Sequence, residues 1–239
     1  MANPKKYDAE SGVDGTGRSP IVPSNELIHP TAIIEKKVSI GAGTAVWDHV
    51  HIRKNTVIGE GCIIGEKTYI AYDVSIGSQV KINAFVYVCT GVTIEDRVMV
   101  GAGTIFTNDR YPRAFDRNGQ SLKSSDPAED ALQTVVRKGA SIGAACTVGP
   151  GVELGPYCMV GMGSVVTRSV LPHELVYGNP ARQQGYVCIC GVPITKKTVS
   201  SMKGEPCLVC LQCGRQYGFT NTGSTTLSCL SDSIKPNEK

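Results

Sequence analysis

A large aliphatic or aromatic residue returns at every sixth position over most of this chain. The series runs unbroken from Ile34 to Phe106 and resumes from Val136 to Val166. Four residues after nearly every member comes a small or β-branched side chain, as at Val38. Neither the period of 2 of a strand nor the period of 3.6 of a helix produces such a series. The chain must therefore fold into short strands joined by tight turns, one strand and one turn for every six residues.

Three of these hexapeptides would close one triangular coil of about 18 residues, and stacked coils would bury both repeating positions in a continuous core. The large residue is often followed by glycine, as at Gly41 and Gly59, where a corner leaves no room for a Cβ atom. The sequence thus predicts an all-β fold, a left-handed parallel β-helix of hexapeptide repeats with about six coils.

The limits of the repeat divide the chain. Residues 1–27 are polar and rich in Gly, Pro and Ser, and they are expected to form a flexible arm. The β-helix domain should occupy 28–187, interrupted by an inserted loop at about 107–135 that is long enough to be functional. A small Cys-rich segment is expected at 188–220, and a flexible tail at 221–239.

Composition restricts the partners and the compartment. The 24 basic and 21 acidic residues give a net charge of +3, too balanced to indicate a nucleic-acid or membrane surface. No apolar run reaches the ~18 residues that span a bilayer, and the first residues do not resemble a signal peptide. We expect a cytoplasmic protein, in which crowded cysteines indicate a metal rather than disulfides.

Two closely spaced cysteine pairs, each followed by glycine, form the second strong motif. They read Cys188-Ile-Cys190-Gly and, about twenty residues on, Cys210-Leu-Gln-Cys213-Gly. Two such turns are typical of zinc knuckles, which bring four thiolates to one tetrahedral ion. With four protein ligands zinc would be structural, and Cys207 is left as a spare thiol. The alternative is a group of free thiols.

A repeat interrupted by one loop and followed by Gly178-Asn-Pro-Ala-Arg182 resembles the hexapeptide-repeat acyltransferases. The segments 46–52 (VWDHVHI), 81–103, 106–114 (FTNDRYPRA) and 137–144 (RKGASIGA) make the chain similar to bacterial nucleotide-sugar N-acetyltransferases. The resemblance implies a homotrimer with active sites between subunits. It also implies acetyl-CoA or a related acyl-CoA as cosubstrate, and as acceptor the 3-amino group of a UDP- or dTDP-linked sugar used for surface polysaccharide.

The same resemblance implies roles for individual residues. His51 and Asn83 take the catalytic positions, His51 as a candidate proton acceptor. Substrate-binding residues are expected on the coils and in the loop: Tyr69, Tyr87, Asn108, Asp109, Arg110 and Arg113. Candidates for binding CoA are Arg137, Lys138, Gly163, Gly178, Asn179, Pro180, Ala181 and Arg182. Because His51, Tyr69 and Tyr87 are 18 residues apart, stacking should place them in one outward-facing column.

Several of these residues have a competing structural interpretation. His51 could serve a subunit interface, and the Asn179–Pro180 pair could merely turn the chain away from the coils. Many relatives carry asparagines where this chain has Ala84 and Phe85, which indicates a less polar pocket. The loop could be a solvated segment with structural ion pairs. For His173, after the last coil, a surface or interface position is expected.

Two other functions are compatible with the same fold. An O-acetyltransferase of a sugar or serine would need a histidine to activate a hydroxyl group. A non-catalytic trimeric assembly module would need no acyl site at all. A carbonic anhydrase built on the same coils is excluded, because no histidine lies between His51 and His173 to hold a catalytic zinc.

Overall fold

The computed structural model describes residues 27–116, 118–122, 132–194, 199–202, 205–221 and 225–230. Residues 1–26 of the expected arm lie outside this part of the chain, as do 231–239 of the expected tail. Every regular element within it is a β-strand. None of the described residues forms a helix long and apolar enough to cross a membrane.

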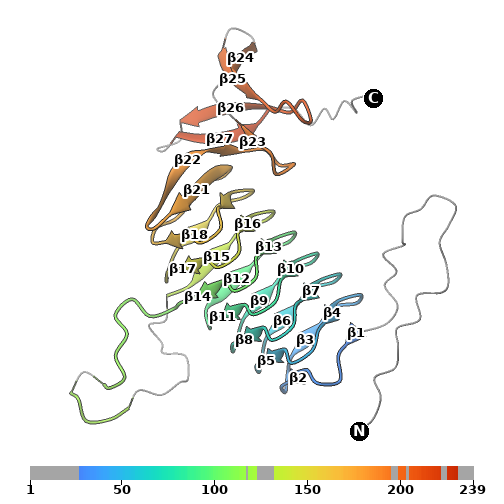
Figure 1. Cartoon of the computed structure of the whole chain (residues 1–239), viewed down its shortest axis with the longest axis vertical. Coiled ribbons are helices and arrows are strands. Elements are labelled where there is room, and N and C mark those ends of the chain that lie inside the picture. Colours follow the sequence, from blue (N-terminus) through green and yellow to red (C-terminus); the bar gives the residue numbers. More distant parts are fainter. Residues whose placement is uncertain are drawn as a thin grey trace, which may run out of the picture.

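Twenty short strands, β1 to β20, wind into three parallel sheets that form the sides of a triangular prism (Figure 1). The first sheet contains β1 (Leu27–Ile28), β4 (Ala45–Val46), β7 (Ile63–Ile64), β10 (Lys81–Ile82), β13 (Met99–Val100), β16 (Ser141–Ile142) and β19 (Met159–Val160). The second contains β2 (Ile33–Ile34), β5 (His51–Ile52), β8 (Tyr69–Ile70), β11 (Tyr87–Val88), β14 (Ile105–Phe106), β17 (Thr147–Val148) and β20 (Val165–Val166). The third contains β3 (Ser39–Ile40), β6 (Val57–Ile58), β9 (Ser75–Ile76), β12 (Val92–Ile94), β15 (Thr134–Val136) and β18 (Glu153–Leu154).

The register confirms the predicted coil. His51 pairs with Tyr69, and Tyr69 pairs with Tyr87, so residues 18 apart lie on adjacent coils. Across the loop the pairing continues without a slip, because Ile105 pairs with Thr147 on the next coil. The predicted left-handed β-helix of stacked hexapeptides is therefore present, and the inserted loop leaves the stacking of the coils intact.

Both repeating positions point into the prism and are buried along its length. Where the smaller position is threonine, its hydroxyl bonds to the neighbouring coil: Thr44 Oγ1 donates to the carbonyl oxygen of Gly59 at 2.8 Å and accepts from the Cys62 N–H at 3.0 Å. These bonds satisfy a polar group that would otherwise destabilise an apolar core.

The glycines that follow the large residue are required by the close approach of successive coils. A Cβ atom on Gly65 would lie 2.6 Å from the backbone nitrogen of Ala84, far inside van der Waals contact. At the corner between the first and second sheets the backbone also turns through the left-handed region, with φ of 55° at His49 and 59° at Phe85. The sequence pattern thus reflects both the spacing of the coils and the geometry of the corners.

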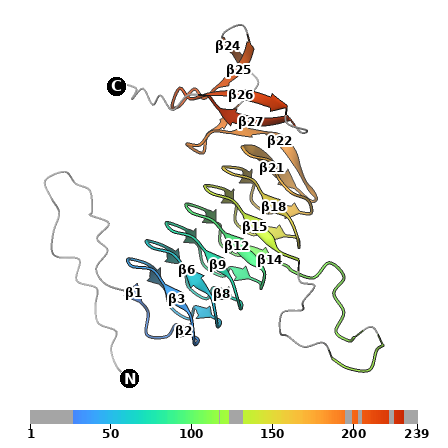
Figure 2. The ribbon, with the colours of Figure 1, turned by 180° about the vertical axis from the view of Figure 1, so that it is seen from behind.

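Beyond the coils, the chain builds an appendage, defined as the described residues from Cys188 onward. β21 (Glu174–Gly178) pairs with β19 in parallel, and β22 (Ala181–Val187) and β23 (Pro193–Ile194) extend that sheet in antiparallel fashion. A separate four-stranded antiparallel sheet contains β24 (Val199–Met202), β25 (Glu205–Val209), β26 (Gln216–Asn221) and β27 (Thr225–Cys229). Figure 2 shows this sheet at the C-terminal end of the prism, far from β1.

The flexible tail was expected from residue 221, but a strand extends as far as Cys229. β26 extends to Asn221 and β27 pairs with it over residues 225–229, with Leu227 buried. The run Thr-Thr-Leu-Ser-Cys has a β-branched pair and one apolar side chain that packs inward. The Ser and Thr content of this run predicted a flexible segment, but the run forms a strand because Leu227 packs into the core of the appendage.

Candidate functional site

The predicted column on the second sheet forms a continuous aromatic face. His51, Tyr69 and Tyr87 begin the neighbouring strands β5, β8 and β11 (Figure 1). The His51 and Tyr69 rings meet edge to face with their centroids 5.4 Å apart, and the Tyr69 and Tyr87 rings stack in parallel, also at 5.4 Å. The side chain of Tyr87 is 43% exposed, so this end of the face is open to a ligand.

His51 is held by a carboxylate that sequence reasoning missed. Its Nε2 atom lies 3.1 Å from Oε1 of Glu35, and the same oxygen lies 2.5 Å from Nε of Arg53. Burial acts to raise the pKa of Glu35, but hydrogen bonds from the Lys54 N–H, His51 and Arg53 outweigh it and lower that pKa. Glu35 is therefore ionised, so His51 must donate from Nε2, and the lone pair of Nδ1 is the basic site of the ring.

Arg53 joins this pair to the tyrosines. Its guanidinium donates to the hydroxyl of Tyr69 at 2.5 Å and to the hydroxyl of Tyr72, and it lies 4.0 Å from the centroid of the Tyr72 ring. The signal that could have identified this set is the 18-residue spacing: Glu35 and Arg53 are one coil apart, directly after the inward aliphatic residue.

Asn83 lies apart from this group. It follows β10 at the corner that leads from the first sheet to the second, and its backbone carbonyl accepts from Thr68 Oγ1 at 3.1 Å. Among the described contacts, none joins its side chain to His51. Two residues on, Phe85 is 57% exposed in a left-handed conformation, with Lys67 Nζ 5.2 Å from its ring centroid.

The predicted loop residues lie where the chain leaves β14. Asn108 is partly buried, whereas Asp109, Arg110 and Arg113 are exposed. Asp109 lies near Cys89, whose pKa is raised to about 12 by burial, with the charge of Asp109 adding to the effect. Cys89 is therefore a neutral thiol at neutral pH and not a nucleophile.

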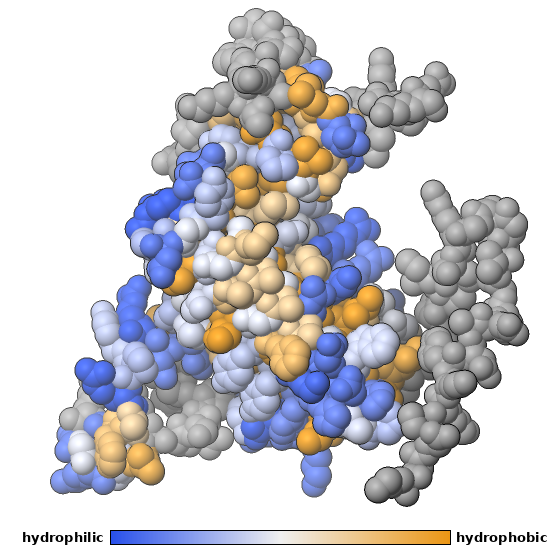
Figure 3. All heavy atoms as spheres, viewed as in Figure 1, coloured by the Kyte–Doolittle hydropathy of each residue, from blue (hydrophilic) through white to orange (hydrophobic). Residues whose placement is uncertain are grey.

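Further out, the loop carries apolar side chains in solvent. Phe115 and Leu122 form an isolated antiparallel bridge, and the Asp116 carboxylate accepts from the backbone N–H groups of Asn118 and Gln120 at 3.1 and 3.0 Å. Leu122 is 72% exposed and Tyr111 is 81% exposed. Figure 3 shows apolar atoms at the outer end of this loop, well away from the prism.

Arg137, which was expected to bind the CoA phosphates, forms ion pairs with two glutamates of its own chain. Its Nε and Nη2 atoms donate to the two carboxylate oxygens of Glu153 at 2.9 and 3.0 Å, and Nη1 donates to Glu95 at 2.8 Å. Both carboxylates come from neighbouring strands of the third sheet, so the guanidinium ties three coils together. The guanidinium fork is thus already occupied by carboxylates, with which a CoA phosphate would have to compete, and the assignment of Arg137 to CoA stays a prediction. Lys138 is exposed beside it.

The remaining cofactor candidates cluster at the C-terminal end of one corner. Gly178 ends β21, and Asn179 and Pro180 form the turn to β22; all three are exposed. The Gly178 N–H donates to Ser164 Oγ at 3.2 Å. Ala181 is buried, whereas Arg182 is exposed with Nη1 donating to the Ala181 carbonyl at 2.8 Å. The turn thus packs against the coil that carries Gly163.

Small residues line this corner over the later coils, a feature that sequence reasoning missed. One stacked position holds Ala84, Ala102, Ala144 and Met162, and the next holds Phe85, Gly103, Ala145 and Gly163. The small side chains therefore lie between two large exposed ones, Phe85 and Met162. A Cβ atom on Gly163 would meet nothing within 4 Å. The corner therefore exposes backbone, whereas the same corner of earlier coils carries Glu66 and Lys67.

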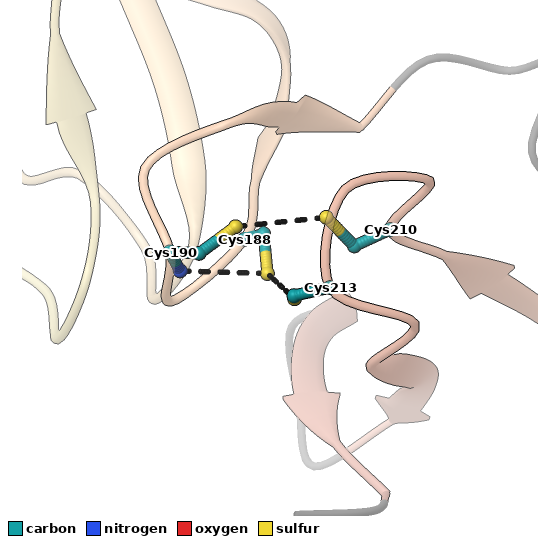
Figure 4. Close-up of side chains that lie close together, drawn as sticks. All are labelled: Cys188, Cys190, Cys210 and Cys213. Carbon is teal, nitrogen blue, oxygen red and sulfur yellow. Dashed lines mark hydrogen bonds between the residues drawn. The ribbon is translucent and has the colours of Figure 1, made fainter. Parts of the chain in front are cut away.

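The four cysteines of the paired motif come together in the appendage. Their sulfur atoms all lie within 4.8 Å of one another, with Cys188 to Cys213 at 3.4 Å and Cys190 to Cys210 at 3.6 Å. Figure 4 shows Cys188 and Cys190 on one turn and Cys210 and Cys213 on the facing turn. Cys207 is buried in β25 and is not part of the group.

The thiols of this group differ in acidity: burial raises the pKa of Cys190 to about 12 and also raises that of Cys210, whereas the pKa of Cys213 is lowered. Burial acts to raise the pKa of Cys213, but the Arg215 N–H and the thiols of Cys188, Cys190 and Cys210 lower it to about 6. The Arg215 guanidinium also donates to Cys213 Sγ at 3.4 Å. A thiolate is the form that binds metals.

An aromatic bridge, Tyr157–His173–Tyr217, connects the appendage to the prism. The His173 ring stacks on Tyr157 at 5.5 Å between centroids and meets the edge of Tyr217 at 5.2 Å. Its Nδ1 atom lies 3.1 Å from the Val187 carbonyl oxygen. His173 is only 5% exposed, so of the two expected positions, surface or interface, the surface one is wrong. Burial lowers its pKa despite the Val187 contact.

Comparisons with known proteins agree with this architecture. Residues 37–72, 73–108 and 133–168 match the family described as bacterial transferase hexapeptide (six repeats). A relative, the dTDP-3-amino-3,6-dideoxy-alpha-D-galactopyranose 3-N-acetyltransferase of Aneurinibacillus thermoaerophilus, is 44% identical over 89 residues. That match covers 37% of this chain and 42% of the relative, so the match spans less than half of the relative's length.

Solved structures show the same kind of likeness at lower identity. The N-acyltransferase AntD of Bacillus cereus, in complex with dTDP and coenzyme A, is 20% identical over 68% of this chain and 81% of its own, with a TM-score of 0.42. PerB of Caulobacter crescentus, in complex with CoA and GDP-perosamine, is 23% identical over 67% of this chain and 57% of its own, with a TM-score of 0.37. By its repeats, which match over 108 of its 239 residues, and by their stacking, the chain is similar to the bacterial transferase hexapeptide proteins.

Proposed function

We propose that this protein transfers an acyl group, acetyl in the simplest case, from acyl-CoA to the amino group of a nucleotide-linked aminodeoxy sugar. The observation that carries the proposal is the Glu35–His51 pair beside stacked tyrosines, in a chain whose repeats resemble an aminosugar N-acetyltransferase. The product would serve surface polysaccharide, and the reaction belongs in the cytoplasm, where acyl-CoA is made.

The reaction, aminolysis of a thioester, needs little catalytic assistance from these residues. The neutral amine attacks the thioester carbonyl, a C–N bond forms, the C–S bond breaks, and CoA leaves as its thiol after taking up a proton. Because a thioester is already activated, positioning and one proton acceptor suffice. His51 Nδ1 would take the amine proton, with Glu35 stabilising the imidazolium through Nε2.

The tyrosine face and the loop would bind the donor and acceptor groups of the nucleotide sugar. Tyr69 and Tyr87 give flat surfaces suited to a sugar ring or a base. The exposed Arg110 and Arg113 are suited to binding a diphosphate. Asn108 and Asp109 are suited to hydrogen bonds with sugar hydroxyl groups. Asn83, at the neighbouring corner, would orient the acceptor.

CoA would lie along the corner of small residues. An extended pantetheine arm needs a surface without bulky side chains, which Ala102, Ala144 and Gly163 provide, and a Cβ atom on Gly163 would meet nothing within 4 Å. Lys138 and Arg182 remain as the basic side chains for its phosphates, since Arg137 is bound to Glu95 and Glu153.

A homotrimer would complete this site. The second sheet presents Ile33 at 56% exposure and Ile105 at 45%, and the loop presents Tyr111 and Leu122 to solvent. Apolar side chains on one face and one loop are typical of a subunit interface. Sedimentation equilibrium should give three times the mass of the chain, and a monomer at assay concentration would contradict this proposal.

The activity is tested with acetyl-CoA and a panel of UDP- and dTDP-linked 3-amino and 4-amino sugars, following thiol release. Turnover with at least one amino sugar, and none with its 3-hydroxy counterpart, is the expected result. If CoA binds by calorimetry but no amino sugar is acetylated, the acceptor assignment is wrong; if CoA does not bind, the chain is an assembly module.

The same Glu35–His51 pair supports a second candidate, O-acetylation of a sugar or serine hydroxyl. A hydroxyl group needs a base far more than a neutral amine does, and a carboxylate-oriented histidine provides one. Acetylation of a hydroxyl acceptor, abolished by His51→Ala, would favour this candidate over the N-acyltransferase.

A further inference from the structure

We propose that Cys188, Cys190, Cys210 and Cys213 hold one structural Zn²⁺ ion, and that this ion fastens the appendage to the C-terminal end of the prism. This inference is independent of the proposed transferase activity. It concerns a site that lies beyond the last coil, on residues that the acyl-transfer chemistry does not use.

The four sulfur atoms fit a tetrahedral ion. A Zn–S bond of ~2.3 Å gives sulfur atoms about 3.8 Å apart in an ideal tetrahedron. The contacts of 3.4 and 3.6 Å lie near that value, and all four atoms lie within 4.8 Å of one another. They are far longer than the ~2.05 Å of a disulfide bond, so the cluster is not a pair of crosslinks.

The backbone around the cysteines is shaped as two matching turns. Gly191 and Gly214 follow the second cysteine of each pair with φ of 86° and 71°, a conformation that L side chains rarely adopt. Within the turns, the Gly191 N–H donates to the Cys188 carbonyl and the Gly214 N–H to the Cys210 carbonyl, both at 2.8 Å. Each turn thus directs its two thiols to the same side.

The surroundings would compensate for the charge of four thiolates. Arg215 Nη1 donates to Cys213 Sγ at 3.4 Å, and the Tyr217 hydroxyl lies 2.9 Å from Cys188 Sγ. The Cys190 N–H points to Cys188 Sγ at 3.5 Å. Such hydrogen bonds to the sulfur ligands are the outer shell that tunes a metal site.

The position of the cluster explains why an ion is needed. Cys188 directly follows β22, a strand of the first sheet of the prism, whereas Cys210 and Cys213 lie between β25 and β26 of the separate sheet. Among the described residues, the apolar core of the appendage is one small cluster of buried side chains, and Cys207 is buried outside it: the cluster holds Cys188, Ile194, Leu208, Cys210, Tyr217 and Leu227. A core of this size does not support a fold without a metal or a crosslink.

The ion would also hold the aromatic bridge. Tyr217 contacts Cys188 through its hydroxyl and His173 through its ring, so it connects a metal ligand to the last coil. Loss of the ion should therefore release Tyr217 from His173 and uncover the end of the prism, while the earlier coils keep their packing.

The test uses the full chain purified from zinc-supplemented medium. Elemental analysis should find about one zinc per chain, and reconstitution with Co²⁺ should give the charge-transfer and visible d–d bands of tetrahedral tetrathiolate cobalt. Cys210→Ser and Cys213→Ser should lose both signals, whereas the matched control Cys207→Ala should keep them. Iron at one equivalent would overturn the identity of the ion, and no bound metal, or equal loss in Cys207→Ala, would overturn the site.

Hydrogen exchange tests the fastening role separately. Removing the metal with a chelator should speed amide exchange at least ten-fold in β22 and β26 and leave the coils from β4 to β14 unchanged. Tyr217→Phe keeps the ring and loses the hydroxyl, so its zinc affinity should fall by roughly 10-fold. Unchanged exchange in β22 and β26 after complete zinc removal would refute the fastening role.

Discussion

At the scale of single residues, two histidines only two positions apart, His49 and His51, lie in different environments. His51 is partly buried, with Nε2 directed to a carboxylate that also binds Arg53. His49 is exposed at a corner and contacts only its neighbour Asp48, at 2.9 Å, among the described ion pairs. The sequence motif VWDHVHI favoured His51 through the family resemblance, but it did not reveal Glu35, because that partner lies one coil earlier.

We predict that His51→Asn lowers kcat by roughly 10²- to 10⁴-fold, the usual contribution of a general base, with a smaller effect on KM. The matched control is His49→Asn, which keeps a side chain suited to the left-handed backbone at that position. Steady-state kinetics with the sugar identified from the panel measure both variants. Equal losses in the two variants, or full activity in His51→Asn, would remove His51 from the mechanism.

The residue scale is also where sequence reasoning was least complete. Arg137 was chosen for its charge, yet Glu95 and Glu153 on the neighbouring coils neutralise it. His173 was expected at the surface or at an interface, and Tyr157 and Tyr217 enclose it between the prism and the appendage. In both cases partners lie on a neighbouring coil, as Glu153 does for Arg137 and Tyr157 for His173, so only the stacking of the coils reveals these contacts.

At the scale of elements, the sequence determined nearly the whole prism. A six-residue period with two inward positions allows one register, and a slip of one residue would turn the apolar side chains outward. Positions that carry glycine after the large residue, such as Gly65, mark where successive coils approach most closely. The appendage strands could not be predicted in the same way, because their core is small and without a period.

We predict that Gly65→Ala destabilises the protein by about 1–3 kcal/mol, the usual cost of an added methyl group in a packed site. Its Cβ atom would lie 2.6 Å from backbone atoms of Asn83 and Ala84, and backbone atoms cannot move aside as the end of a flexible side chain can. Gly185→Ala in β22 is the control, since a Cβ there meets nothing within 4 Å. Urea unfolding measures both, and equal midpoints would show that the coils can separate to accommodate the methyl group.

At the scale of the whole molecule, the prism and the appendage have two separate apolar cores. The core of the prism continues to Val176 and Ala181, and that of the appendage begins at Cys188. The buried ring of His173 lies between them, and its Nδ1 atom is hydrogen-bonded to the Val187 carbonyl oxygen. This junction makes the stability of the assembled chain depend on the charge of one histidine.

The sign of that dependence follows from the direction of the pKa shift. Burial lowers the pKa of His173 below its ordinary value of 6.5, and the contact with Val187 offsets only part of the effect. The unfolded chain therefore binds a proton at a higher pH than the folded chain does. Stability should be greatest above pH ~6.5 and fall as the pH drops from there through the lowered pKa of the folded state.

We predict that His173→Asn, which cannot be protonated in this range, is less stable than the wild type near pH 7.5 but shows a flatter decline toward pH 5.5. The asparagine can occupy the left-handed backbone at this position, where φ is 61°. Thermal unfolding of both proteins at matched zinc concentrations isolates the contribution of His173, because acid release of the metal affects both curves. Parallel curves would show that His173 stays neutral in both states, and that the junction is held by packing and by the metal alone.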